Sequence, residues 1–98
     1  MALFVVRHQH PADRCPAADP QMGAQLLDYL GTTNAERNGI TIHSEAVIDN
    51  QHTLYIILEA NDTAIIDRFM QPFKMAGSVE ILQASPCTAV VARRGCAA

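Results

Sequence analysis

Two short runs of the chain, Leu3–Val6 and Leu54–Leu58, are apolar at every position. Their β-branched and aromatic residues favour β-strands. Because successive side chains of a strand point to opposite faces of a sheet, such runs predict a sheet that is buried on both faces. Leaving one apolar face in water would forfeit several kcal/mol at roughly 25 cal/mol per Å². We therefore expect a homodimer in which a second subunit covers the face that the helices leave open.

Local signals predict helices between these strands. Asp19 followed by Pro20 is typical of a helix start, and Gly31 of its end. Asp62 caps a later helix, which Pro72 should kink or split. The expected elements are strands over 2–8, 40–48, 53–59 and 79–82, helices over 20–30, 33–38 and 63–76, and a further strand over 88–92.

The order of these elements predicts an α+β, ferredoxin-like βαββαβ fold with an extra C-terminal strand, formed by a single domain over 1–98. In this fold the sheet order is 4-1-3-2 and both helices pack on one face. We expect the first and third strands to be parallel and the second to run antiparallel to them.

The stretch HSEAVIDNQHTLYIILEANDTAIIDRFMQPFKMAGSVEILQ supports this fold with a succession of strand, acidic turn, strand, capped helix, glycine and strand. This pattern, over roughly 40–84, resembles the dimeric α/β-barrel superfamily. It is similar in particular to a group of small bacterial ferredoxin-like proteins that includes nickel-binding members. The resemblance implies dimerisation and a transition-metal site.

The segment HQHPADRCP, 8–16, carries the residues best suited to such a site. His8 and His10 are two positions apart in a strand, so their side chains lie on the same side about 7 Å apart. Cys15 follows in a loop that is restricted by flanking prolines. Imidazole and thiolate ligands favour Zn, Cu or Ni over Mg or Ca, which prefer oxygen.

The expected strand directions add one more candidate ligand to those in this segment. They place His43 and Glu59 at the same end of the sheet as His8, and His52 and Cys87 at the opposite end. The sequence therefore predicts a metal site formed by His8, His10, Cys15 and His43. In a competing interpretation, the histidines form a polar strand end hydrogen-bonded to the loop, and the cysteine packs as a small hydrophobic residue.

Composition excludes several other classes of function. A net charge of −3 with scattered Lys and Arg is unsuited to binding the phosphates of nucleic acid. The apolar run at the N-terminus is too short for a signal sequence or a membrane span. Three cysteines, Cys15, Cys87 and Cys96, cannot all pair within one chain. We expect a cytoplasmic protein with free thiols and no membrane partner.

Three functions are consistent with these sequence features. The first is a homodimeric protein that sequesters, carries or senses a transition-metal ion. The second is a small-molecule enzyme of the dimeric α/β-barrel type, resembling a monooxygenase, with an apolar cavity between the helices and the sheet. The third is a non-catalytic dimerisation module.

Overall fold

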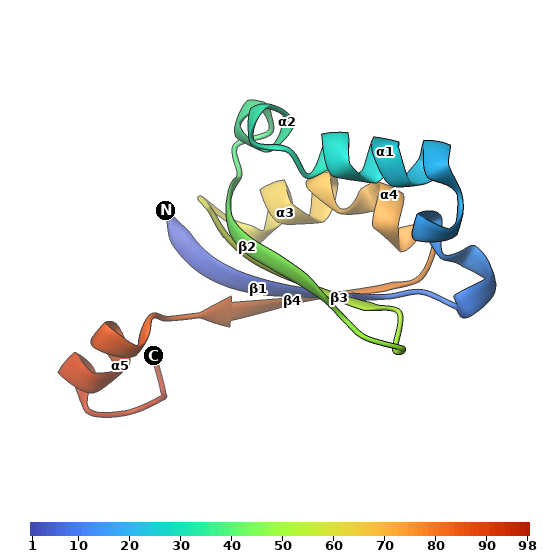
Figure 1. The fold of residues 1–98 in the computed structure, drawn as a ribbon. Coiled ribbons are helices and arrows are strands. Elements are labelled where there is room, and N and C mark those ends of the chain that lie inside the picture. The colour runs from blue at the N-terminus through green and yellow to red at the C-terminus, as the bar shows by residue number, and fades with distance from the viewer.

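A computed structural model describes residues 1–98 as a four-stranded sheet with helices on one face (Figure 1). The elements in chain order are β1 (Ala2–Gln9), the short 3-10 turns η1 (Ala12–Arg14) and η2 (Pro16–Ala18), α1 (Pro20–Tyr29), α2 (Thr32–Arg37), β2 (Thr41–Ile48), β3 (Thr53–Ala60), α3 (Thr63–Phe69), α4 (Gln71–Lys74), β4 (Ser78–Ala84) and α5 (Cys87–Arg93). None of these helices is long and apolar enough to span a bilayer.

The sheet has the strand order β2-β3-β1-β4, which is the expected order read from the other edge. Every neighbouring pair is antiparallel. The prediction that the first and third strands are parallel is therefore wrong. In the β1–β3 pair, His8 lies opposite Leu54, so the end of β1 lies beside the start of β3.

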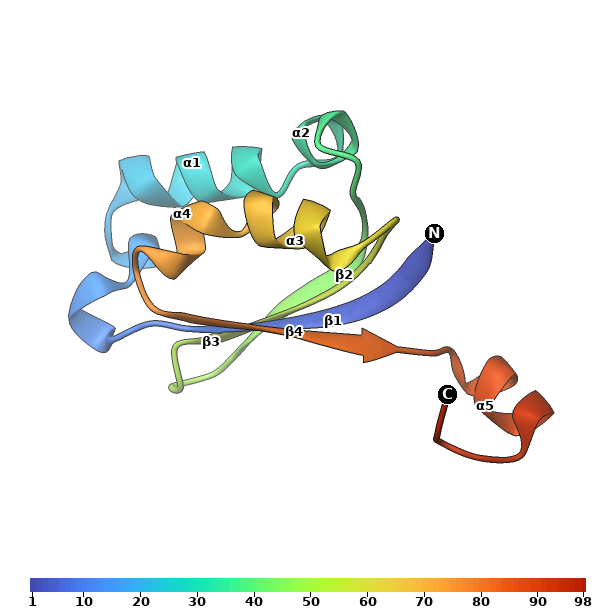
Figure 2. The same cartoon turned by 180° about the vertical axis from the view of Figure 1, so that it is seen from behind.

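The helices α1, α3 and α4 cover one face of the sheet, and the hydrophobic core lies between them and the strands (Figures 1 and 2). Alternate residues of the central strands supply the sheet side of this core, including Val6 of β1 and Ile56 of β3, which have no exposed surface. Ile66 and Phe69 of α3 pack onto them. Each such side chain stabilises the fold by roughly 1.5–3 kcal/mol through burial.

The predicted helix starts and the split at Pro72 are confirmed, whereas Gly31 has an extended backbone and is the N-cap of α2. The Asp19 side chain accepts a hydrogen bond from the Gln21 N–H at 2.9 Å, with Pro20 at the first helical position. Asp62 likewise accepts from the Ile65 N–H at 3.0 Å. The helix that contains Pro72 is split into α3 and α4, because proline lacks the N–H that would continue the helix.

The predicted fifth strand over 88–92 is wrong, because the segment forms the helix α5. A strand needs a neighbour for its backbone hydrogen bonds, whereas a helix satisfies them locally. Here Ala89 and Val90 donate to the Pro86 carbonyl at 3.0 and 3.2 Å. The helix extends from the end of β4 and lies away from the rest of the chain (Figures 1 and 2). Val91 is 74% exposed on it.

The face of the sheet opposite the helices is open and has an apolar centre. Val5 of β1 lies between Ile57 of β3 and Leu82 of β4 in the strand register. Ile57 is 41% exposed and Leu82 is 44% exposed. No other element of the chain covers this face (Figure 2).

Candidate metal centre

The antiparallel pairing of β1 and β3 brings two histidines together at one end of the sheet. His10 directly follows β1, and His52 directly precedes β3. The His10 N–H donates to the His52 carbonyl at 3.2 Å, which extends the ladder one residue beyond the strands. Their rings meet edge to face with centroids 5.2 Å apart.

Cys15 joins these two histidines from the loop between β1 and α1. It lies between η1 and η2, where the chain makes two short turns: Arg14 N–H donates to the Pro11 carbonyl at 2.9 Å, and Ala18 N–H donates to the Cys15 carbonyl at 3.2 Å. Its thiol is free and half-buried. One ligand atom from each of His10, Cys15 and His52 lies within 4.8 Å of the other two. We call these three residues the donor group.

The His10 ring is the most unusual member of the donor group. Both of its nitrogens are buried and neither has a hydrogen-bond partner. An unpaired buried polar group costs about 1–3 kcal/mol, so native proteins rarely retain one without a reason. Burial, with a smaller contribution from His52, lowers the pKa of His10 below its ordinary value of 6.5. Burial therefore favours the neutral ring, which is the form that binds a metal.

His8 lies beside the donor group and is almost completely buried, at 3% exposure. Its Nδ1–H donates to the Ser78 carbonyl at 3.0 Å, which leaves the lone pair on Nε2. Its ring packs against those of His10 and Phe73, with centroids 5.3 and 5.2 Å away. Burial lowers the pKa of His8, opposed by the hydrogen bond to Ser78, and His10 lowers it further. His8 and His10 therefore share one face of the strand, as their spacing predicts.

His52 holds its position with a backbone conformation that most residues avoid. It ends the turn between β2 and β3 with φ of +50°, and Asn50 in the same turn has φ of +64°. Left-handed conformations of this kind cost of order 1 kcal/mol in non-glycine residues and are concentrated at functional sites. The turn therefore fixes the position of the imidazole at an energetic cost.

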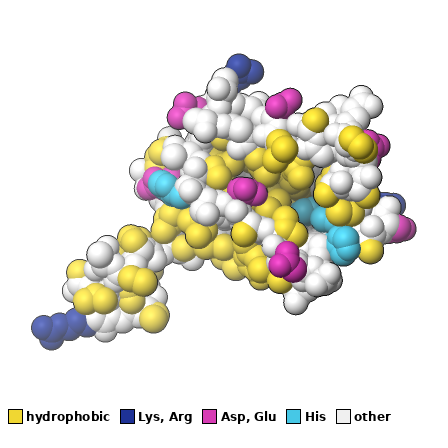
Figure 3. Space-filling view, viewed as in Figure 1, with side chains coloured by type: hydrophobic (Ala, Val, Ile, Leu, Met, Phe, Trp, Pro, Cys, Tyr) yellow, Lys and Arg dark blue, Asp and Glu magenta, His cyan; other side chains and the backbone are white.

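The donor group lines a cavity of about 500 Å³ between α1, α4 and the sheet. Its walls are mainly apolar and include Leu26, Leu30, Val47 and Phe73. The space-filling view shows histidine atoms inside a hollow that is bordered by hydrophobic side chains (Figure 3). A molecule in this cavity would therefore contact the donor group.

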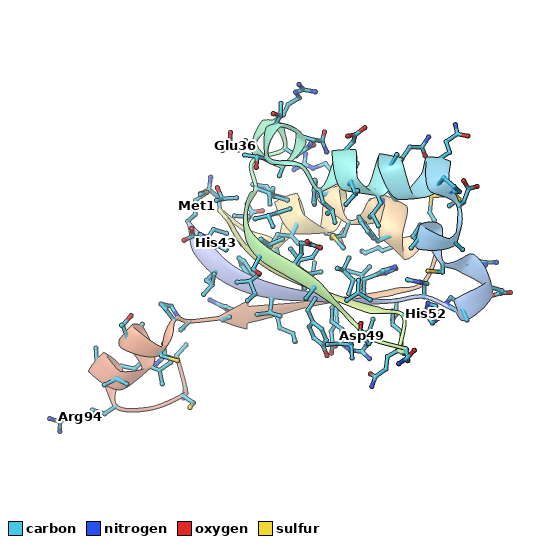
Figure 4. The ribbon with its side chains drawn as sticks, in the orientation of Figure 1. Met1, Glu36, His43, Asp49, His52 and Arg94 are labelled. Carbon is cyan, nitrogen blue, oxygen red and sulfur yellow. The ribbon has the colours of Figure 1, made fainter.

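His43 lies at the other end of the sheet from the donor group, as Figure 4 shows for His43 and His52. It lies at an irregularity in β2, and its Nε2–H donates to Glu59 Oε2 at 2.8 Å. Of the four predicted ligands, the structure thus brings together His10 and Cys15, with His8 adjacent. Cys87 and Cys96 are free and exposed on the C-terminal segment.

The predicted parallel pairing of β1 and β3 assigned both His43 and His52 to the wrong end of the sheet. The short turn at 49–52 makes β2 and β3 an antiparallel hairpin, and the helical crossover from β1 makes β1 and β2 parallel. Together these two facts make β1 and β3 antiparallel. That combination was the signal that could have placed His52 beside His10.

Comparison of the chain with protein-family models, curated proteins and solved structures finds no match.

Proposed function

We propose that this protein binds a transition-metal ion, Zn, Cu or Ni, through His10, Cys15 and His52. The observation that carries the proposal is the His10 ring, whose two buried nitrogens lack any protein partner while a thiol and a second imidazole lie within reach. An ion bound to one of these nitrogens would satisfy it.

The chemistry of the donor group supports this choice of ion. Two imidazoles and one thiolate form a mixed nitrogen and sulfur set, which suits borderline and soft divalent ions better than Mg or Ca. Three protein ligands leave a fourth position free in a tetrahedral site. His8 is a positioning residue in this proposal, because its hydrogen bond to Ser78 fixes a ring that packs against His10.

We further infer that two copies of the chain pair as a ferredoxin-like dimeric α/β-barrel. The open apolar face around Val5, Ile57 and Leu82 supports this inference, since a second copy of the same face would remove it from water. The isolated position of α5 also supports it, because a short helix without buried residues is marginal in water and a partner would bury part of it.

Metal analysis of protein purified without an affinity tag tests the metal proposal. A Cys87→Ala/Cys96→Ala background leaves Cys15 as the only thiol. We expect one ion bound per chain after dialysis against Zn²⁺, and a loss of about tenfold or more in affinity in His52→Asn, since asparagine tolerates the left-handed backbone but lacks the imidazole. His43→Ala is the matched control and should bind like the parent. Equal binding by these two variants would refute the proposal.

Sedimentation equilibrium tests the dimer. We expect a dimer at micromolar concentration and a folded monomer for Ile57→Lys, because residue 57 is already exposed in the single chain. A monomeric parent protein would contradict the inference.

A further inference from the structure

The cavity beside the donor group has the size and the lining of a small-molecule site. Its volume of about 500 Å³ lies within the usual range for such sites, roughly 300–1,000 Å³. The helix α1 and its C-cap supply Leu26 and Leu30, the sheet supplies Val47 and Leu54, and α4 supplies Phe73. The part of a ligand that fills this space should therefore be apolar.

Two polar side chains along the cavity are already hydrogen-bonded within the protein. Tyr29 already donates its O–H to the Phe69 carbonyl at 2.6 Å, and His8 donates its Nδ1–H to Ser78. The other polar residues in the lining are the neutral Gln25 and Asn50 and the charged Glu45, Asp49 and Arg14. Two carboxylates and one guanidinium in the lining disfavour an anionic group on the part of the ligand that does not bind the ion.

The donor group is the part of the cavity wall that can hold a metal ion. An ion held by His10, Cys15 and His52 would have cavity space on one side, because all three residues line it. Its fourth ligand would then come from whatever occupies the cavity. A site that already prefers nitrogen and sulfur favours a thiolate as that ligand. A thiolate also presents a single donor atom, whereas a carboxylate has a second oxygen that needs a hydrogen-bond partner of its own.

We infer that the cavity binds a small hydrophobic thiol, whose sulfur completes the coordination of the ion and whose apolar body lies between α1, α4 and the sheet. The inference rests on the metal site proposed above. It adds the chemical class of the ligand and the residues that select it.

Cobalt-loaded protein in the Cys87→Ala/Cys96→Ala background provides a direct test. Each sulfur bound to Co²⁺ adds charge-transfer absorption, so thiol binding can be followed by titration under anaerobic conditions. The first probe, 2-phenylethanethiol, has both a thiol and an apolar body. The second, 2-mercaptoethanol, lacks the apolar body, and the third, ethylbenzene, lacks the thiol. We expect 2-phenylethanethiol to bind at least about tenfold more tightly than 2-mercaptoethanol, and ethylbenzene to leave the spectrum unchanged.

A cavity-filling variant locates the binding site. Val47 is 56% exposed and lines the cavity, so Val47→Trp can fill the space with little disturbance of the core. We expect this variant to bind Co²⁺ normally and to lose the preference for 2-phenylethanethiol. Val91→Trp on α5, where the side chain is 74% exposed, is the matched control and should behave like the parent.

The outcomes separate this inference from the metal proposal. If Co²⁺ binds but the two thiols bind equally well to the parent protein, the ligand class is wrong and the metal site stands. The same conclusion follows if Val47→Trp retains the preference for 2-phenylethanethiol. If the parent binds no Co²⁺, both proposals fall.

Discussion

Gly77 offers the sharpest test of how the fold positions the end of β1. A methyl group built on Gly77 would lie 2.9 Å from both the Gln9 carbonyl carbon and His10 Cα, and closer still to the Gln9 carbonyl oxygen. All three atoms belong to the backbone, so no side chain can rotate away to make room. Gly77→Ala therefore forces β1 and the start of β4 apart at the residue that carries the unpaired imidazole.

The expected cost follows from the same contacts. Adding a methylene group to a well-packed site usually costs about 1–3 kcal/mol. Because only the backbone can yield here, we expect the upper end, a loss of about 3 kcal/mol in the free energy of unfolding. Gly23→Ala is the control: its new methyl group would meet only the Pro16 carbonyl oxygen, at an ordinary 3.8 Å. Within α1 this change should stabilise by roughly 0.5–1 kcal/mol through helix propensity.

Urea unfolding followed by circular dichroism, in metal-free buffer at pH 7, measures both changes. The two variants should shift the unfolding midpoint in opposite directions. Gly77→Ala should also weaken Zn²⁺ binding, because it displaces His10 from the donor group. Similar midpoints for the two variants would refute the account of this contact.

Three further predictions concern other parts of the molecule. Burial lowers the pKa of His8 and His10 in the folded chain, so below about pH 6.5 the unfolded chain takes up protons more readily. The stability of the metal-free protein should therefore fall from pH 7 to pH 5.5. In urea unfolding, His8→Phe should show a smaller fall in stability, and an equal fall would count against the burial argument. Tyr29→Phe removes the hydrogen bond to the Phe69 carbonyl and should cost about 1 kcal/mol in the same assay; no change would mean that the hydrogen bond contributes nothing net. Removal of 86–98 should weaken dimerisation in sedimentation equilibrium while changing the unfolding free energy of the single chain by less than about 0.5 kcal/mol, because α5 has no buried residue. Unaltered dimerisation would exclude α5 from the interface.

Features set by neighbouring residues were predictable from the sequence. Asp19 and Asp62 begin helices because their side chains accept hydrogen bonds from N–H groups two or three residues later, and Pro72 splits a helix because it lacks an N–H. The shared face of His8 and His10 follows equally from strand geometry.

Features set by distant contacts were not predictable in the same way. The approach of His52 to His10 depends on the direction of two strands more than forty residues apart, and one wrong strand direction moved His52 to the far end of the sheet. The segment at 88–92 has β-branched valines, but it becomes a helix because no strand pairs with it. The approach of Cys15 to the histidines depends on the conformation of its loop. The prolines on either side of Cys15 restrict this conformation but do not determine it.

X-ray absorption spectroscopy of the zinc-loaded protein in the Cys87→Ala/Cys96→Ala background tests the central claim most directly. The donor group predicts one Zn–S distance of about 2.3 Å and two Zn–N distances of about 2.0–2.1 Å. Cys15→Ser should remove the sulfur contribution, and His43→Ala should leave the spectrum unchanged. A zinc environment made only of oxygen, or a sulfur contribution that survives Cys15→Ser, would contradict the account.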